Sequence, residues 1–276
     1  MNIAKVINNN VISVYQTDGT ELVVMGRGIA FKKKPGDTVD ETRIQKVFAL
    51  KNKQTSDNFK MLLREVPLDL IVIVEEVIND AKHNLNRKLN ENIYVSLTDH
   101  INFAIERYRE GLEIKNALLW EIKQLYREEF AIGLRTLEQI KQKLGIELPV
   151  DEAAYIALHI VNAEMNEEVI TTMSITKFIQ QIINIAKYHF KVDFDEDSLS
   201  YFRFITHLKF FAQRVFKGNH YENNYDHLYD LIKEKHKDAA ACTEKIGTFV
   251  KKEYNHELTN EEKLYLTVHI ERVVNR

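Results

Sequence analysis

Most of the chain beyond residue 65 repeats itself, and this repeat constrains the fold more than any other feature of the 276 residues. Residues 148–160 (LPVDEAAYIALHI) match residues 258–270 (LTNEEKLYLTVHI) at an offset of 110. Such a period is far above the roughly 20–45 residues of a solenoid repeat. The sequence therefore predicts two tandem copies of one domain, at residues 56–170 and 171–276.

Helices are the expected structure of both copies. Nine glycines and three prolines in the whole chain leave few residues that break a helix. Apolar residues recur at helical spacing, as at Leu118 and Ile122. Thr259 and Glu262 form a capping-box pattern before an apolar run, and Pro149 suits a helix start at the matching place in the first copy. Each copy is predicted to be an all-α helical bundle.

The first 55 residues are predicted to form a small antiparallel β-sheet domain, which makes the chain an α+β multidomain protein. Asp18-Gly19 is typical of a type I′ hairpin turn. Because so small a sheet buries little surface, we expect one face to pack against a second copy of the chain. Residues 51–64 carry no clear pattern and are predicted to be a linker. Segments rich in β-branched and aromatic residues predict strands at residues 3–7, 11–15, 21–25, 28–32 and 44–50.

Charge divides at the same place. Residues 1–55 contain nine lysines and arginines against five acidic residues, a net charge of +4, whereas the whole chain carries −3, so the remainder carries −7. The single cysteine, Cys242, excludes an internal disulfide. MNIAKVINNN lacks the apolar core of a signal peptide, and no run approaches the roughly 18 apolar residues of a membrane span. We expect a cytoplasmic protein without membrane insertion.

Two pairs of histidines recur between the copies: His100 matches His207, and His159 matches His269. Inherited polar positions in a helix interface would explain this without a function. Metal binding is not expected, because the sequence has no H-x-x-x-H pattern and no cysteine partner. General acid–base catalysis lacks a nucleophile motif. Phosphorylation suits these residues, since neutral imidazole is a nucleophile near pH 7 and each phosphoryl group adds nearly two negative charges.

The N-terminal domain contains candidate nucleic-acid ligands, each with a plainer alternative. Asn8-Asn9-Asn10 suits a turn, but asparagine also pairs with base edges. Phe31 suits either a core position or stacking on bases, and Lys32-Lys33-Lys34 either a solvated turn or phosphate contact. Gly26-Arg27-Gly28 is no dinucleotide-binding loop, because no helix is expected after it. Without a DNA-recognition helix, binding of irregular RNA by the sheet is favoured.

These motifs together resemble a known family. IAKVINNNVISV, ELVVMGRGIAFKKKPGD and IQKVFAL resemble the RNA-binding co-antiterminator domain of the BglG/SacY/LicT antiterminator family. The two repeats resemble the family's sugar-phosphotransferase-system regulation domains, and the similarity extends over essentially the whole chain, most of all to LicT-like members. The resemblance implies a protein that is not an enzyme and needs neither cofactor nor metal. It places RNA-binding residues at Lys5, Asn8, Asn10, Gly26, Arg27 and Phe31, and phosphorylation at His100, His159, His207 and His269.

The resemblance also implies a mechanism and partners. A homodimer binds a messenger RNA hairpin that overlaps a terminator, so that transcription of a β-glucoside or β-glucan operon continues. The phosphocarrier HPr phosphorylates the second regulation domain and thereby activates the antiterminator. The sugar permease (enzyme II) phosphorylates the first regulation domain and thereby inactivates the antiterminator. Two alternatives are a phosphohistidine-carrying phosphotransfer protein without RNA binding and a DNA-binding activator. No nucleotide or phosphoenolpyruvate motif supports the former, and no N-terminal helix-turn-helix pattern supports the latter.

Overall fold

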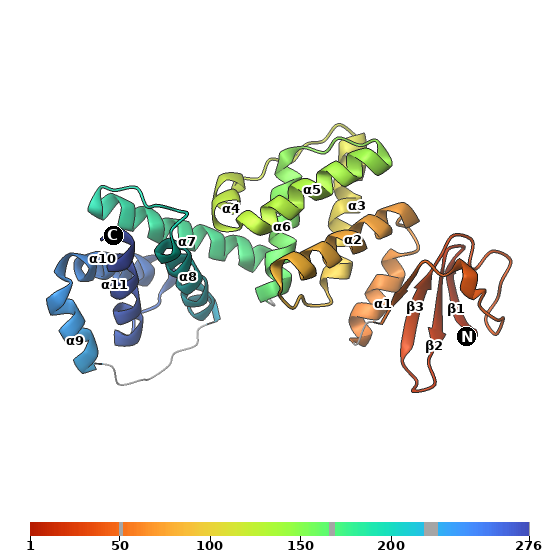
Figure 1. The fold of residues 1–276 in the computed structure, drawn as a ribbon, viewed down its shortest axis with the longest axis horizontal. Coiled ribbons are helices and arrows are strands. Elements are labelled where there is room, and N and C mark those ends of the chain that lie inside the picture. Colours follow the sequence, from red (N-terminus) through yellow and green to blue (C-terminus); the bar gives the residue numbers. More distant parts are fainter. Residues whose placement is uncertain (50–51, 166–168, 218–225, 276) are drawn as a thin grey trace. The chain divides into compact units, whose positions relative to one another are not determined.

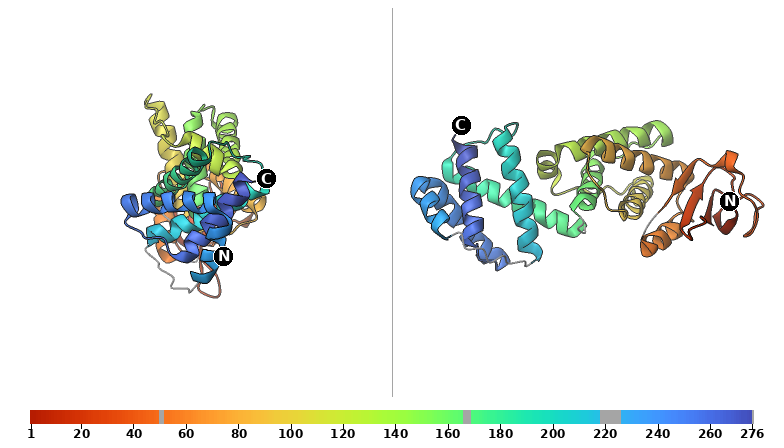
Figure 2. Two further views of the ribbon diagram at one scale, coloured as in Figure 1. Left: turned by 90° about the vertical axis from the view of Figure 1, so that its left-hand side faces the viewer. Right: turned by 60° about the horizontal axis from the view of Figure 1, so that its bottom comes forward.

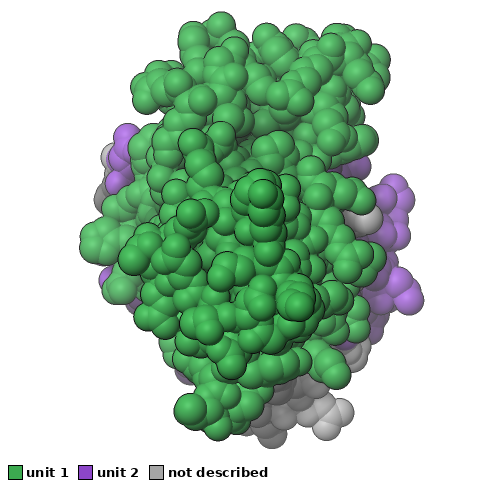
Figure 3. All heavy atoms as spheres, turned by 90° about the vertical axis from the view of Figure 1, so that its right-hand side faces the viewer, with its two compact units in different colours: residues 1–169 green, residues 170–276 purple. Residues whose placement is uncertain are grey.

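The computed structural model describes residues 1–49, 52–165, 169–217 and 226–275, and it divides into two compact units, residues 1–169 and 170–276 (Figures 1 and 3). No helix in these ranges combines the length and hydrophobicity that a membrane crossing requires. The first unit contains a β-sheet and the helices α1 (Lys53–Leu62), α2 (Leu68–Leu85), α3 (Ile93–Arg109), α4 (Leu119–Leu125), α5 (Arg127–Leu144) and α6 (Val150–Met165). The chain continues with α7 (Val169–Phe190), α8 (Leu199–Lys217), α9 (Asp226–Lys235), α10 (Lys237–Tyr254) and α11 (Asn260–Val274).

The N-terminal sheet is antiparallel, as expected, with strand order β1-β2-β3-β4. Its strands are β1 (Ile3–Asn8), β2 (Val11–Tyr15), β3 (Glu21–Met25) and β4 (Lys46–Phe48). The β2–β3 hairpin closes where the N–H of Gln16 donates to the carbonyl of Thr20 at 2.9 Å. Within this fully described loop only Gly19 has a positive φ, of 84°. The hairpin is confirmed, but the type I′ turn is wrong, because Asp18 does not adopt the left-handed conformation that such a turn needs.

Residues 28–32 do not form the predicted strand. Consecutive turns follow β3, with the N–H of Phe31 donating to the carbonyl of Gly28 at 3.1 Å. Gly28 and Lys32 have positive φ values of 67° and 58°, which turn the chain away from an extended path. A short 3₁₀ helix, η1 (Glu41–Arg43), precedes β4. Of the strand predicted at residues 44–50, only Lys46–Phe48 forms a paired strand, and residue 50 lies outside the described residues.

The predicted linker at residues 51–64 contains a helix. The side chain of Asn52 caps α1 by accepting the N–H of Thr55 at 3.0 Å. On the helix, Phe59 is only 1% exposed, because its ring packs edge-on against Phe48 of the sheet. Figures 1 and 2 show α1 beside the strands. The polar composition of this segment gave no helical pattern in the sequence. The helix is stabilised instead by its one buried aromatic side chain, which packs on the sheet.

The chain covers both faces of its sheet, in contrast to the expected packing of one face on a second copy. One face, with Val11, Val23 and Met25, joins a core formed with α1, α2 and α3. The opposite face is covered by the residues between β3 and β4, including Ile29 and Val39. The sheet thus gains its buried surface from its own chain, and it shares a core with the first helical repeat.

The two helical repeats have the same order of elements, α2–α6 and α7–α11, as the duplication predicts. In the first repeat α3 packs on α6, and in the second α8 packs on α11. The capping box is confirmed: Thr259 Oγ1 accepts the N–H of Glu262 at 3.2 Å, and the Glu262 carboxylate accepts the N–H of Thr259 at 3.0 Å. These helix pairs carry the recurring histidines.

Candidate functional site

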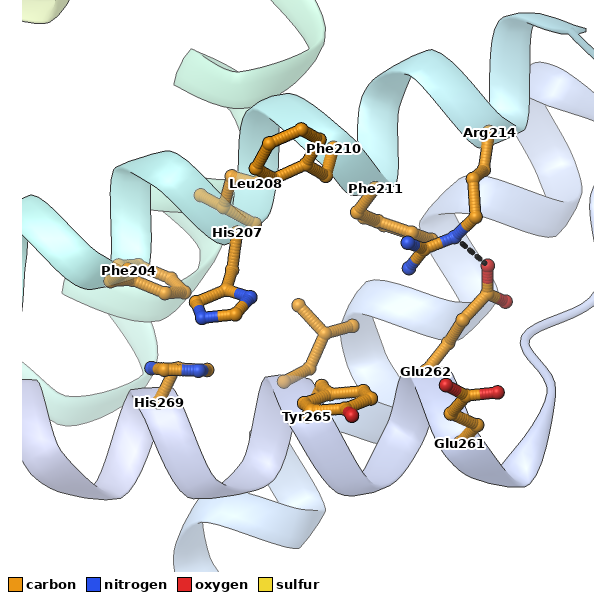
Figure 4. Close-up of a pocket in the computed structure, with 11 residues that line it drawn as sticks. Phe204, His207, Leu208, Phe210, Phe211, Arg214, Glu261, Glu262, Tyr265 and His269 are labelled. Atoms are coloured by element: carbon orange, nitrogen blue, oxygen red, sulfur yellow. Dashed lines mark hydrogen bonds and ion pairs between the residues drawn. The ribbon is translucent and has the colours of Figure 1, made fainter. Parts of the chain in front are cut away.

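Each repeat brings its two histidines together across a helix interface. His100 of α3 faces His159 of α6, with ring centroids 4.8 Å apart. In the second repeat, His207 of α8 stacks on His269 of α11 at 3.9 Å, with 30° between the ring planes (Figure 4). The repeat in the sequence matches each histidine with its counterpart in the other copy. The fold instead brings the two histidines of one copy into contact with each other.

The inner histidine of each pair is buried and neutral. His159 is 9% exposed, and burial, together with the charge of His100, lowers its pKa to about 3. His269 is 7% exposed, and burial, with His207, Arg272 and Arg203 nearby, lowers its pKa to about 4. Both imidazoles therefore carry a lone pair on one ring nitrogen at neutral pH, which is the form that acts as a nucleophile.

The outer histidine of the first repeat, His100, lies against a carboxylate. Its Nε2 lies 3.0 Å from Oε2 of Glu152, and its side chain is 15% exposed. The other oxygen of Glu152 accepts a hydrogen bond from Arg107 Nη2 at 2.8 Å. Burial alone would raise the pKa of Glu152, but His100 and Arg107 hold it below its ordinary value. The first site is thus a compact cluster of one buried anion between two cationic or ionisable groups.

The outer histidine of the second repeat, His207, is exposed. Partial burial and the charge of Arg214 lower its pKa. Here Arg214 lies 3.4 Å from Oε1 of Glu262, and both line a hollow of about 230 Å³ that opens beside the two rings (Figure 4). The second site therefore presents its imidazole to solvent beside a cation and an anion.

The glutamate and arginine of each site were missed as site residues by the sequence analysis. A signal existed: Glu152 and Glu262 recur at the same offset of 110 as the inner histidines, and Arg107 and Arg214 recur at the same offset of 107 as the outer ones. Asp99, which precedes His100 in sequence, is exposed and is not the carboxylate of this cluster. Among the described residues, no group of three or more His, Cys, Asp or Glu side chains is placed to hold a metal.

The candidate RNA ligands centre on the loop that follows β3. The backbone carbonyl of Asn10 accepts the N–H of Gly26 at 2.9 Å, and its side-chain oxygen accepts the N–H of Gly28 at 2.8 Å. Gly26 has no room for a side chain, since a Cβ there would lie 1.8 Å from the carbonyl oxygen of Arg43. Asn10 and Gly26 therefore fix the loop in place on the β1–β2 turn.

This fixed loop displays an aromatic ring and cations. The side chain of Arg27 is 79% exposed, and its nearest carboxylate, that of Asp69, is 3.7 Å away. Phe31 is 58% exposed, with Lys32 Nζ 5.4 Å from its ring centroid. The core alternative for Phe31 is thus wrong, because the ring faces solvent.

Lys5 and Asn8 lie on the edge strand β1. Lys5 is exposed. The side chain of Asn8 is engaged within the chain, because its amide donates to the carbonyl of Leu63 at 2.6 Å and its oxygen accepts the N–H of Asn10 at 2.7 Å. Hydrogen bonds therefore link Asn8, Asn10 and the loop that carries Arg27 and Phe31 into one surface.

Two family models match separate parts of the chain. The family model described as "CAT RNA binding domain" matches residues 1–57, and that described as "PRD domain" matches residues 75–163 and 180–273. The transcription antiterminator LicT of Bacillus subtilis is 60% identical over 276 residues, which is all of both chains. The beta-glucoside operon antiterminator of Dickeya chrysanthemi is 45% identical over 273 residues, 99% of this chain and 96% of that one.

A solved structure shows the same fold for the first part of the chain. The crystal structure of GlcT CAT-PRDI superposes with a TM-score of 0.52 at 39% identity, over 60% of this chain and 98% of that one. An RNA-binding domain followed by two PRD domains defines the class of the protein. The chain belongs to the BglG/LicT family of transcription antiterminators.

Proposed function

We propose that this chain binds, as a homodimer, a messenger RNA hairpin that overlaps a terminator, and thereby lets transcription of a β-glucoside or β-glucan operon continue. Residues 1–55 bind the RNA, and residues 56–170 and 171–276 control the binding. The exposed Arg27 and Phe31, on a loop fixed by Asn10, are the observation that carries this assignment. An exposed ring beside cations suits stacking on unpaired bases together with phosphate contact. The relative named as a β-glucoside operon antiterminator supports the operon class.

Phosphorylation of the four paired histidines is the proposed control. The neutral rings of His159 and His269 and the exposed ring of His207 support this role, as does the match of two PRD domains. HPr would modify His207 and His269 and favour the active dimer, whereas the sugar permease would modify His100 and His159 and inactivate. Each phosphoryl group brings about 1.5–2 negative charges next to Glu152 or Glu262. Such a change shifts the population of two dimer arrangements by a coupling of about 1–3 kcal/mol.

Binding of RNA is tested with the full chain and a terminator-overlapping RNA hairpin from a β-glucoside operon leader. Fluorescence anisotropy should give tight binding that weakens as salt is raised, because phosphate contacts release counterions. Arg27→Ala should lower the affinity at least about tenfold. Arg109→Ala, which removes one exposed cation from the first helical repeat, is the matched control and should retain wild-type affinity. Equal binding of the DNA hairpin of the same sequence, or an unaffected Arg27 variant, contradicts the proposal.

Control by phosphorylation is tested with phosphorylated HPr and the full chain. Mass spectrometry at neutral pH should find acid-labile phosphate on His207 or His269, and sedimentation should show a change in self-association. If phosphate is transferred on to another protein while no RNA is bound, the alternative of a phosphotransfer carrier is correct instead. If no histidine is modified, the control half of the proposal fails, whatever the RNA measurements show.

A further inference from the structure

The two repeats hold their site glutamates in different ways. In the first repeat, Glu152 contacts Arg107 with Oε1 at 2.8 Å and His100 with Oε2 at 3.0 Å. In the second repeat, the matching Glu262 also contacts its arginine through Oε1, but Oε2 is engaged elsewhere. It lies 3.1 Å from His256 Nε2 and accepts the N–H of Thr259 at 3.0 Å. Figure 4 shows the Glu262 carboxylate turned toward Arg214 and away from His207.

The difference originates in the loop before the last helix of each repeat. At the offset of 110, His256 corresponds to Ile146, and Thr259 corresponds to Pro149. Isoleucine has no polar side-chain atom, and proline has no N–H to donate. The first repeat therefore lacks both groups that engage the second oxygen of Glu262, and that oxygen of Glu152 contacts His100 instead.

The backbone of this loop turns in the same way in both repeats. The different contacts of the two glutamates therefore come from the side chains of the loop and not from its backbone path. Gly145 and Asn255 end the preceding helices with φ values of 68° and 54°. Their N–H groups donate to the carbonyls of Lys141 and Lys251 at 3.0 and 3.1 Å. Each of these lysines then pairs with the acid after the loop, Glu147 or Glu257. Ile146 and His256 are both buried, with exposures of 8% and 4%.

We propose that His256 and Thr259 are positioning residues that keep Glu262 away from His207, and that Ile146 and Pro149 let Glu152 hold His100. This inference rests on the proposed phosphorylation and deepens it, because it makes His207 the readily modified outer histidine and His100 the restrained one. Beside the carboxylate, Nε2 of His100 carries the ring proton. A phosphoryl group can therefore be accepted at Nε2 only after the carboxylate is displaced and the proton has moved to Nδ1. In the transfer, a ring nitrogen uses its lone pair to form the N–P bond. The bond from phosphorus to the donor breaks with its electron pair left on the donor, and the other ring nitrogen keeps its proton.

Several charged groups besides Glu262 face His207 and must stay constant in a test. Arg214 on α8 and Glu261 on α11 line the same hollow, together with Tyr265 and His269. Arg203 on α8 and Arg272 on α11 line an adjoining hollow that also includes His207 and His269. Variants confined to His256, Thr259 and Glu262 leave these residues in place.

The first test replaces His256 by Ile in the full chain, which installs the residue of the first repeat. The carboxylate then keeps only the N–H of Thr259 on Oε2 and should lie closer to His207, so the pKa of His207, measured by NMR of the unphosphorylated protein, should rise. Phosphorylation of His207 by phosphorylated HPr should slow several-fold. His256→Gln keeps a donor for Glu262 and should behave as wild type. The double variant His256→Ile with Glu262→Gln should restore both the pKa and the rate.

The reciprocal test makes the first repeat resemble the second. Ile146→His combined with Pro149→Thr should draw Glu152 away and speed phosphorylation of His100 by its donor. Glu152→Gln should do the same without changing the loop, which keeps the test valid if the double variant does not fold. An unchanged His207 pKa in folded His256→Ile overturns the inference. An altered pKa with no modification of any histidine in the wild type supports the positioning role and overturns the proposed function.

Discussion

Phe48 of β4 packs edge-on against Phe59 of α1, with ring centroids 5.2 Å apart and 71° between the ring planes. Tyr94 of α3 joins the same cluster, with its ring centroid 5.5 Å from that of Phe48. The sheet that displays the candidate RNA ligands therefore shares aromatic contacts with the helix that carries His100. The ring of Tyr94 thus places α3 in direct contact with the sheet and with α1.

Removal of the Phe59 ring should destabilise the first unit. Phe59→Ala leaves a cavity between the sheet and α1, and a buried phenylalanine typically contributes about 3–5 kcal/mol in such a substitution. Met61→Ala on the same helix is the control, because Met61 is 66% exposed, and it should change stability by less than about 0.5 kcal/mol. Urea denaturation followed by circular dichroism measures both. Similar losses for the two variants would refute the shared core.

The two site arginines should differ in their contribution to stability. Arg107 has a side chain only 10% exposed, so Arg107→Ala leaves the buried charge of Glu152 without its main partner, at a cost of about 3–5 kcal/mol. Arg214 is 33% exposed and lies farther from its glutamate, which keeps His256 and Thr259 as partners. Arg214→Ala should cost less than about 2 kcal/mol. Thermal or urea unfolding of the full chain gives the free energy of unfolding of each variant. A decrease for Arg214→Ala that equals or exceeds the decrease for Arg107→Ala would contradict the prediction.

Acid should destabilise the protein through the two inner histidines. Above their ordinary pKa of 6.5, His159 and His269 are neutral in the folded and the unfolded chain, and their contribution is fully present. Below pH 6.5 the unfolded chain binds protons that the folded chain does not bind until about pH 4 for His269 and about pH 3 for His159. The free energy of unfolding should fall by up to about 1.4 kcal/mol per pH unit for each histidine.

The pH dependence of the free energy of unfolding can be measured in variants that lack the inner histidines. His159→Gln and His269→Gln should each flatten the fall in unfolding free energy between pH 6.5 and 4. His83→Gln, at an exposed position of α2, serves as the control and should leave the slope unchanged. A slope that persists in the double variant His159→Gln with His269→Gln would assign the acid sensitivity to other groups.

Gly26 should tolerate no side chain. A methyl group there would meet the carbonyl oxygen of Arg43 at 1.8 Å, so Gly26→Ala must displace the loop that carries Arg27 and Phe31. We expect a loss of about 1–3 kcal/mol in stability and a loss of specific RNA binding. Gly19→Asn, in the β2–β3 loop, is the control, because asparagine accepts the positive φ of 84° at that position and no atom lies within 4 Å of its Cβ. Wild-type RNA affinity in Gly26→Ala would separate this loop from the binding surface.

Features that follow from the spacing of residues along the chain could be predicted from the sequence. The repeat, the capping box at Thr259, the β2–β3 hairpin and the two histidine pairs all follow from spacing along the chain. The turn type at Asp18 and the strand expected at residues 28–32 were wrong, because the closing hydrogen bonds and the left-handed Lys32 depend on contacts of the folded loop.

The tertiary structure alone decided which groups meet. The helix α1 is stabilised because Phe59 packs on Phe48, which precedes it by 11 residues and lies on strand β4. Glu152 contacts His100 and Glu262 contacts His256, although the two glutamates occupy the same place in their repeats. Sequence determined the residue types, the helical faces and the duplication, since these can be read from the order of residues along the chain without any knowledge of how the helices pack. The partner of each carboxylate depends on donors brought close only when helices pack, and no spacing rule along the chain encodes that distance.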